Sequence, residues 1–408
     1  MKIKNLIYLS SSLLLLSACT NNRTPLDTTE ETTLSSELEE LTYIDSPGLI
    51  EEEIILPDPI SISIQFAGDI LLHGTLGGKT ADNTYDYKPF FQFINPLLDA
   101  DLIIANMEMP IDANGDNSDI GTYPLFNAPF EILEAVQYAG FNHLVNANNH
   151  ALDQRYTGVL KTIENFEKAH ITHTGTYKSQ EDFNTPTIID VEGIQVGIIA
   201  YADSLNGMDN VVPADILPFT IRKFSSGNLD SLDTMLTDLE NLKNAGADLI
   251  IFSLHWGAEY KDYPTDMQKE IAQILIENGI DIVMGHHSHT PQPVEWHTRA
   301  DGSRGFIIYS LGNLMADQIA LNIPQTQYGM IVKTNITKDE LGDISITSAN
   351  IIPTTFVRDT NRTLGGSYSI IPAPAGVVDD NITVDTFRNK AILAYEHISS
   401  LVDEAFLN

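Results

Sequence analysis

The chain has 408 residues, 43% of them hydrophobic, and a formal net charge of −34. This apolar content is ordinary for a globular protein and excludes wholesale disorder, and the length allows a large folded core with additional segments. The acidic balance excludes sequence-independent binding of nucleic acid and electrostatic docking on anionic lipid, because both require a basic surface. An anionic substrate would need a locally bound cation, such as a metal ion.

Residues 1–19 have the pattern of an export signal. A basic start precedes the mostly apolar run Leu6–Leu16, and small residues follow. Such a run is too short to span a membrane. Leu16-Ser17-Ala18-Cys19 resembles the bacterial lipobox, which implies a lipidated Cys19 that anchors the protein in the cytoplasmic membrane, on its extracellular face. Cys19 is the only cysteine, which favours this interpretation over a plain signal peptide.

Residues 20–60 predict an extended tether between this anchor and a folded domain. The segment is rich in Thr, Ser and Glu, and Arg23 is its only basic residue. It therefore repels itself and buries little surface. Because the mature domain has no cysteine, any metal ligands in it must be oxygen and nitrogen atoms.

Residues 61–355 predict a folded α/β domain, in which strand-like runs alternate with helical ones. Ile188–Val191 and Ile194–Tyr201 predict a hairpin, and Gly329–Thr334 and Ile344–Ile352 predict antiparallel strands that extend a second sheet. We expect two mixed sheets packed face to face with helices outside. The expected helices are Pro89–Leu98, Pro129–Ala139, Thr157–Ala169, Leu229–Ala245 and Thr265–Asn278.

Residues 356–408 predict a C-terminal extension that ends in a helix. Val384–Phe406 has helical periodicity, with apolar residues at Ile392, Ala394, Ile398 and Leu401. An amphipathic helix of this kind either packs on its own domain or binds a partner, and we favour packing.

Six apolar runs end in residues that can bind a metal or form hydrogen bonds. Three histidines in Gly285-His286-His287-Ser288-His289 follow one such run, and alternate side chains leaving a strand share a face. Any single strand end could be an ordinary turn, but the repetition favours one assembled site. The other five ends are Gly68-Asp69, Asn106-Met107-Glu108, Asn146–His150, His255–Glu259 and Ser310–Asn313.

These motifs, with Asp153, Tyr260 and Gln292 beside them, jointly resemble the bacterial capsule-synthesis CapA family, also called the poly-γ-glutamate synthesis family. The resemblance runs from about Ser61 to Pro353 in the family's order. It implies kinship with the calcineurin-like metallophosphoesterases, and therefore a four-layer α/β/β/α sandwich of two mixed sheets with a metal site. It also implies one or two divalent ions, and ligands of these types do not distinguish manganese, iron and zinc.

The resemblance implies a role for each matched residue. Glu108 takes the place of a bridging carboxylate, and His150 assists the leaving group or stabilises charge. The implied metal ligands are Asp69, Glu108, Asn149, His255, His287 and His289. The residues expected to support these ligands or contact the substrate are Asn106, Asn148, Asp153, Glu259, His286 and Asn313.

Four of the supporting residues carry open alternatives or conditions. Asn148 fits a turn as well as the site, and Asn313 either orients a ligand or closes a turn. His286 should point away from His287 and support the site without binding the metal. Glu259 would share the face of His255 if that segment were helical. Six histidines outside the motifs should mostly be surface or packing residues: His73, His143, His170, His173, His297 and His397.

Three functions follow from the resemblance and the residues. The favoured one is a surface-anchored component of poly-γ-glutamate, or related anionic polymer, synthesis or export, with the polymer and membrane synthase components as implied partners. The second is an extracellular metal-dependent hydrolase of phosphoester or amide bonds. The third is a non-catalytic scaffold that binds polymer or synthase. Whether the protein is an enzyme stays open at this point.

Overall fold

The computed structural model describes residues 56–73, 76, 84–113 and 119–407. The predicted export signal, Cys19 and all of the predicted tether before residue 56 lie outside the described residues. Within the described part, no helix combines the length and apolar character needed to cross a bilayer.

The larger sheet has eight strands in the order β14-β13-β12-β1-β2-β3-β4, with β11 paired to β1. The strands β1 to β4 are parallel, whereas β12, β13 and β14 are antiparallel. Their bounds are β1 (Ile60–Ile70), β2 (Leu102–Met107), β3 (His143–Val145), β4 (Thr172–Thr174), β11 (Asn313–Met315), β12 (Tyr328–Lys338), β13 (Ile344–Arg358) and β14 (Tyr368–Pro372).

The smaller sheet has six strands in the order β5-β6-β7-β8-β10-β9. The predicted hairpin is confirmed as the antiparallel pair β5 and β6, while β6, β7, β8 and β10 run parallel. The bounds are β5 (Thr187–Val191), β6 (Ile194–Ala202), β7 (Leu249–His255), β8 (Ile282–His286), β9 (Val294–Thr298) and β10 (Arg304–Ile308).

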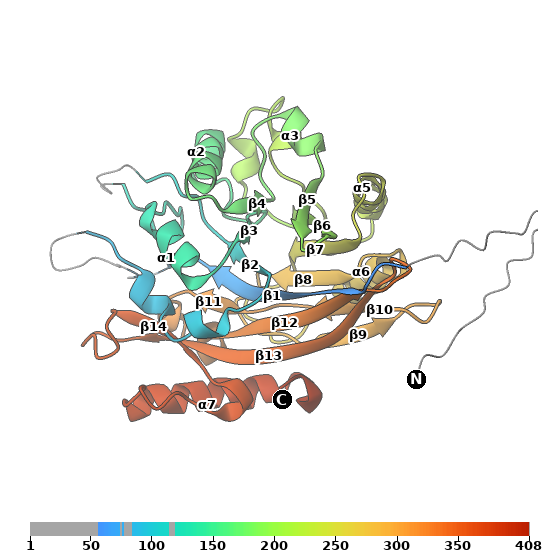
Figure 1. The fold of residues 1–408 in the computed structure, drawn as a ribbon. Coiled ribbons are helices and arrows are strands. Elements are labelled where there is room, and N and C mark those ends of the chain that lie inside the picture. Colours follow the sequence, from blue (N-terminus) through green and yellow to red (C-terminus); the bar gives the residue numbers. More distant parts are fainter. Residues whose placement is uncertain (1–55, 74–75, 77–83, 114–118, 408) are drawn as a thin grey trace, which may run out of the picture. The chain divides into compact units, whose positions relative to one another are not determined.

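The two sheets pack face to face between helices (Figure 1). Phe66 and Ile104 of the larger sheet share a core cluster with Ile251 and Ile308 of the smaller one. Helix α1 covers the outer face of the larger sheet, and α5 and α6 cover that of the smaller sheet. This confirms the predicted four-layer α/β/β/α sandwich.

Four of the five expected helices form, with ends shifted by at most three residues. Thr265 caps α6 through a reciprocal capping box with Gln268, and Gly140 closes α1 in the left-handed region at φ 109°. The helices are α1 (Glu131–Ala139), α2 (Arg155–Lys168), α3 (Gln180–Asn184), α4 (Leu217–Thr220), α5 (Leu232–Asn244), α6 (Asp266–Glu277) and α7 (Asp385–Ser399).

The predicted helix Pro89–Leu98 is wrong. The segment forms two short 3-10 helices, η1 (Lys88–Phe91) and η2 (Asn95–Leu97). Pro96 lies late in the expected helix, where its ring removes a backbone donor and clashes with the preceding turn. The apolar periodicity reflects burial of the phenylalanines and not a continuous helix.

The late strands are antiparallel, as predicted, and lie in the other sheet from the β5–β6 hairpin. They extend the larger sheet, in which β12 pairs along its length with β1, the first strand. The expected boundary between residues 355 and 356 falls inside β13. The C-terminal residues thus add β14 and α7 to the same folded unit.

The C-terminal helix packs on its own domain, as expected. Ala391, Ala394 and Ile398 of α7 are buried, and α7 lies along β13 (Figure 1). Ile392, assigned to the packed face, is instead 39% exposed. Ala394 and Ile398 are buried as predicted, and Ala391 takes the buried position expected for Ile392.

Candidate metal centre

The carboxyl ends of parallel strands from both sheets meet at one place. In the larger sheet Asp69 of β1 is in register with Asn106 of β2, and in the smaller sheet His255 of β7 is in register with His286 of β8. All four side chains are buried. Strands at neighbouring positions thus carry polar residues into a site between the sheets, which is where open α/β sheets place ligands.

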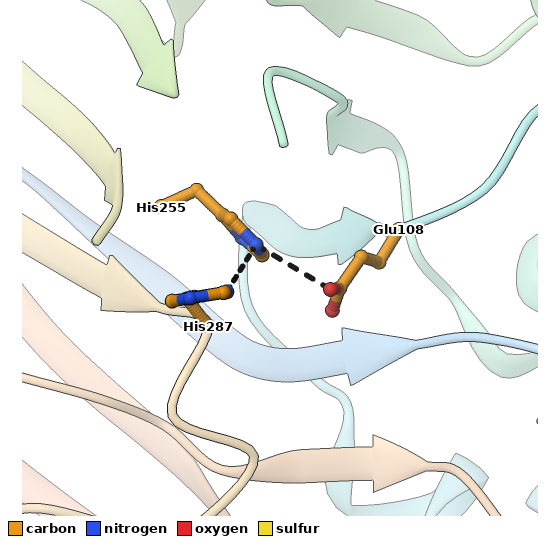
Figure 2. Close-up of side chains that lie close together, drawn as sticks. All are labelled: Glu108, His255 and His287. Atoms are coloured by element: carbon orange, nitrogen blue, oxygen red, sulfur yellow. Dashed lines mark hydrogen bonds and ion pairs between the residues drawn. The ribbon is translucent and has the colours of Figure 1, made fainter. Parts of the chain in front are cut away.

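Glu108, His255 and His287 form one group of metal-ligand type, with one ligand atom of each lying within 4.8 Å of the others. His255 Nε2 lies 3.4 Å from Glu108 Oε1 and 3.0 Å from His287 Nδ1 (Figure 2). Asn149 joins this group, since its Oδ1 lies 3.0 Å from the same His255 nitrogen. Four atoms that can bind a metal therefore surround one point.

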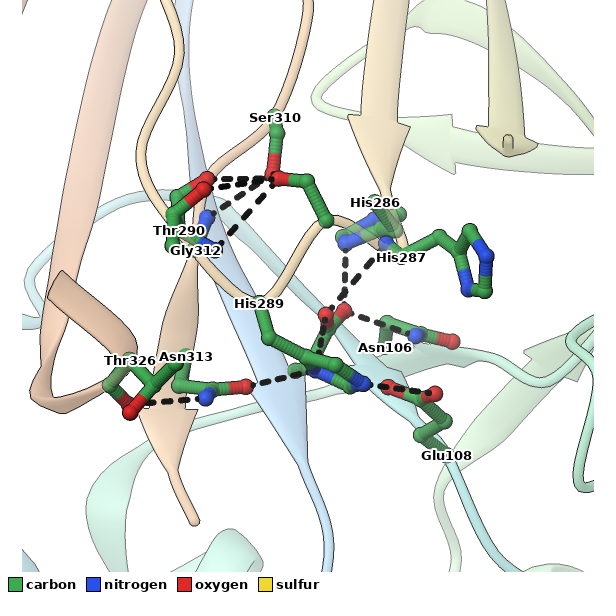
Figure 3. A network of polar contacts seen from close by, with 12 residues as sticks. Asn106, Glu108, His286, His287, His289, Thr290, Ser310, Gly312, Asn313 and Thr326 are labelled. Atoms are coloured by element: carbon green, nitrogen blue, oxygen red, sulfur yellow. Dashed lines mark hydrogen bonds and ion pairs between the residues drawn. The ribbon is translucent and has the colours of Figure 1, made fainter. Parts of the chain in front are cut away.

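Asp69, Glu108 and His289 form a second group with the same spacing. His289 Nδ1 lies 3.4 Å from Asp69 Oδ2, and His289 Nε2 lies 3.7 Å from Glu108 Oε1 (Figure 3). Glu108 is common to both groups. This is the position that a carboxylate bridging two ions would occupy.

The chemistry of these groups fits a divalent cation. Glu108 is fully buried, and neither of its oxygens accepts a hydrogen bond from any described residue. Burying an ionised carboxylate without a partner is strongly unfavourable, so a cation beside Glu108 would compensate it. We name Asp69, Glu108, Asn149, His255, His287 and His289 together the candidate metal centre; their ligand roles stay predictions.

Asp69 is held from two sides. Asn106 Nδ2 donates to its Oδ1 over 2.8 Å, and His286 Nδ1 lies 2.9 Å from the same oxygen. His286 therefore contacts a predicted ligand and belongs to neither ligand group. Burial would raise the pKa of Asp69, but hydrogen bonds from His286 and His289 outweigh it and hold the pKa well below its usual range.

The loop after β8 carries two predicted ligands in an unusual backbone conformation. His287 has φ 90° and His289 has φ 57°, a region that costs a non-glycine residue on the order of 1–3 kcal/mol. Ser288 Oγ donates to the Thr290 carbonyl over 2.6 Å and lies within hydrogen-bond distance of Ser310 Oγ at 2.8 Å, and these contacts fix the loop. In this conformation each of the two imidazoles has a nitrogen within 4.8 Å of a Glu108 oxygen.

Asn313 contacts both His289 and the loop that follows β11, so its contacts fit both of the alternatives left open. Its Oδ1 lies 3.0 Å from His289 Nδ1, and its Nδ2 donates to Gln318 Oε1 and the Thr326 carbonyl. Burial would lower the pKa of His289, but its hydrogen bond to Asp69 outweighs this and raises the pKa. In its neutral form, with Nδ1 bonded to the amide oxygen, His289 would present the lone pair of Nε2 to a bound ion.

Asn148 serves both of the roles left open for it. Its Nδ2 donates to Asn106 Oδ1 over 3.2 Å and to the Met107 carbonyl over 2.9 Å, which ties the loop to β2. Its Oδ1 accepts from the His150 backbone N–H, as in an Asx turn. The same Asn148 side chain therefore forms the turn and contacts Asn106 beside the candidate metal centre.

His150 is paired with Asp153 beside the centre. Asp153 Oδ2 lies 2.8 Å from His150 Nδ1 and also accepts from the Phe126 backbone N–H. The Phe126 ring packs edge-on against His150 with centroids 4.6 Å apart. Because the carboxylate accepts the Nδ1 proton, the neutral ring carries its lone pair on Nε2, the geometry of a proton acceptor.

The buried groups have strongly shifted pKa values. Burial, followed by the charges of Asp69 and Glu259, raises the pKa of Glu108 well above its usual value. Burial and the neighbouring His287 hold the pKa of His255 well below its usual value, and burial and His289 lower that of His287 to about 4. Both imidazoles are therefore neutral near pH 7, the form that binds metals.

The expectation for Glu259 depended on a helix that does not form. The residues after β7 make bends and turns, and Glu259 is exposed. It does not share the face of His255, but its charge raises the pKa of Glu108 after burial and Asp69. Glu259 therefore acts on the centre electrostatically from the protein surface.

Asp203 is a residue of the site that the motifs missed. Its backbone N–H donates to the His255 carbonyl over 3.0 Å, and its charge acts on His287. Ser226 bonds both oxygens of the Asp203 carboxylate. The signal was present, because Asp203 directly follows the apolar strand β6 just as Asp69 follows an apolar run.

Residues 63–318 match the family described as "Bacterial capsule synthesis protein PGA_cap". This match covers more than half of the chain, and the protein belongs to that family. The chain is 26% identical to "Capsule biosynthesis protein CapA" of Bacillus anthracis over 74% of this chain and 71% of that one. It is 25% identical to "PGA biosynthesis protein CapA" of Bacillus subtilis (strain 168) over 71% and 72%.

Among solved structures, the NAD nucleotidase NadN of Haemophilus influenzae aligns with a TM-score of 0.42 and 14% identity. The alignment covers 85% of this chain and 57% of that longer one.

Proposed function

We propose that this protein is a surface-anchored component of the biosynthesis or export of poly-γ-glutamate or a related anionic capsule polymer. Membership in the capsule synthesis family, and the names of the two Bacillus relatives, support this role. The lipobox-like sequence at Cys19 supports attachment to the outer face of the cytoplasmic membrane. Membrane-bound synthase components and the polymer itself are the proposed partners.

A chemical role is supported by one observation above all: the buried carboxylate of Glu108 belongs to two ligand groups at once. We infer one or two divalent ions there. A bound ion would supply Lewis-acid polarisation and an activated water. It would also neutralise charge locally, so that an anionic chain can approach a protein of net charge −34.

The residues of the chain would divide the remaining work. Asn106 and His286 hold Asp69, and Asn313 holds His289. His150, oriented by Asp153, would move a proton at Nε2. This arrangement supports a second candidate, in which the same site hydrolyses a phosphoester or amide bond during polymer assembly or release.

A complementation experiment tests the polymer role. The full chain would be expressed in a capsule-polymer-producing Bacillus whose own CapA gene is deleted, and cell-surface polyglutamate would be measured. We expect the wild type to restore polymer and Glu108→Ala to fail at equal protein abundance. His297→Ala, a change in a pair with Glu277 on the surface, is the matched control. Absence of polymer with abundant, membrane-associated wild type would contradict the proposal.

The hydrolase role is tested with the purified, metal-loaded protein. Release of phosphate from phosphoesters and of glutamate from γ-linked polyglutamate would be followed with and without a chelator. We expect one of these activities to depend on both metal and His150. If neither bond is cleaved while the metal is bound, the site would act without hydrolysis.

The anchor has its own test. Cys19→Ala should release the protein from the membrane fraction or stall its processing, because a single thioether-linked cysteine would be its only lipid attachment. Fractionation followed by immunoblotting measures this, and unchanged membrane association would argue against a lipid anchor.

A further inference from the structure

A polar cavity lies at the edge of the smaller sheet, outside the candidate metal centre. Its volume is about 360 Å³, and residues of β5, β6 and α5 line it. None of its lining residues belongs to the candidate metal centre. The volume is within the range of small-molecule sites.

A buried arginine, Arg222, lines this cavity and is held by contacts with several neighbouring residues. Arg222 is 9% exposed, its Nε donates to Asp238 Oδ2 over 3.0 Å and its Nη2 donates to the Phe183 carbonyl over 2.7 Å. Its guanidinium lies 4.0 Å from the Phe183 ring centroid and 4.9 Å from that of Tyr177. These bonds use Nε and Nη2, and a side-chain hydrogen bond with Tyr177 uses one more of the five guanidinium N–H donors.

Asp238 forms its side-chain hydrogen bonds through only one of its two carboxylate oxygens. Its Oδ2 accepts from both Arg222 Nε and the Tyr201 hydroxyl, the latter over 2.5 Å. Within the described part of the chain, Oδ1 accepts no hydrogen bond. The pair therefore has guanidinium N–H donors and one carboxylate oxygen left for a ligand, and these groups of opposite charge lie side by side.

A second cavity of about 340 Å³ touches the same Arg222 and Asp238. The side chains of Arg222 and Asp238 are only 9% and 15% exposed, so most of the ion pair is shielded from bulk water although two cavities border it. Charges that are partly desolvated gain most from a ligand that completes their hydrogen bonds.

We propose that the 360 Å³ cavity binds a free α-amino acid, with the ligand carboxylate on Arg222 and the ligand ammonium on Asp238. A simple anion would be repelled by Asp238 and a simple cation by Arg222, whereas a zwitterion complements both charges. The Tyr177 ring and Leu242 form an apolar wall for the ligand side chain, and the exposed Asn241 and Asn244 form a polar rim.

Titration calorimetry with the full-length protein tests the proposal. The twenty standard amino acids and D-glutamate would be titrated singly to millimolar concentration. We expect saturable binding of at least one, with one ligand per chain, and no binding of the corresponding acid without its amino group or amine without its carboxylate. No binding by any amino acid would overturn the proposal.

Two variants locate the binding. Asp238→Asn should weaken it at least about tenfold, since a charge-assisted bond is lost. That change could also disturb Arg222, so Asn241→Trp, at the exposed rim on α5, fills the cavity mouth without touching the ion pair. Glu240→Trp, exposed on the same helix and outside the cavity lining, is the matched control.

We expect Asn241→Trp to abolish binding and Glu240→Trp to leave it unchanged. Binding that survives Asn241→Trp would place the ligand elsewhere and overturn the proposal. A chelator should not affect binding, whereas a loss on metal removal would assign the amino acid to the candidate metal centre and likewise contradict the cavity.

Discussion

Buried histidines occur in two regions of this molecule, and only one region has the features of a metal site. His255 and His289 lie between strand ends with carboxylates within 4 Å. His143 on β3 is as deeply buried, yet its Nδ1 lies 2.9 Å from Thr172 Oγ1 and it belongs to no ligand group. Burial of an imidazole therefore does not by itself indicate a metal site. A metal site is indicated by imidazoles that converge with carboxylates from several strands.

Removing a shared ligand should have the largest effect. Glu108→Ala and His287→Ala should each lose the bound metal, because Glu108 contributes to both groups and His287 to one. Elemental analysis of the purified proteins measures the ion-to-protein ratio. His143→Gln, a buried histidine change outside the groups, should keep the wild-type ratio. Normal metal content in both Glu108→Ala and His287→Ala would contradict the assignment of the metal site to the region of Glu108 and His287.

Removing the proton carrier should come next. If the site is hydrolytic, His150→Ala should lower kcat by about 10²–10⁴-fold, the usual contribution of a positioned acid or base, and leave the metal content unchanged. Asp153→Asn should have a smaller effect that alters the pH profile, since it changes only how His150 is oriented and protonated. Equal activity in wild type and His150→Ala would remove His150 from the mechanism.

In the metal-free protein, the buried carboxylate of Glu108 should lower the free energy of unfolding. The raised pKa of Glu108 means that burial opposes its charge. A carboxyl whose pKa is higher in the folded state lowers stability at pH values above its unfolded pKa. Glu108→Gln should therefore require a higher denaturant concentration to unfold than the metal-free wild type at pH 7. With metal added, the order should reverse. A less stable metal-free Glu108→Gln would contradict this account.

The packing histidine should show a smaller, pH-dependent effect. Burial lowers the pKa of His143 to about 3. Because the unfolded chain takes up this proton near pH 6.5 and the folded one does not, stability falls as pH decreases between these values. From pH 7 to 5 the loss from this residue is about 2 kcal/mol. Urea unfolding at both pH values should show a weaker pH dependence for His143→Gln, and an identical dependence would refute this assignment.

Much of the candidate site was predictable because β-strands obey local rules. Asp69, Asn106 and His255 each end an apolar run, and the carboxyl ends of parallel strands meet at one edge. The same rule applied to Asp203 would have found it as well. Where local rules compete, the predictions failed. Pro96 broke an apparent helix, and the turn after β7 removed Glu259 from the face of His255.

The sequence by itself determined the four-layer architecture, the family and the set of polar strand ends, since these depend on period, turn residues and order along the chain. Only the tertiary structure decided that Glu108 is shared between two groups and that His286 contacts Asp69. It alone brought Arg222 and Asp238 to the wall of a cavity. Such facts depend on side-chain direction and on contacts between residues distant in sequence, which no local pattern encodes.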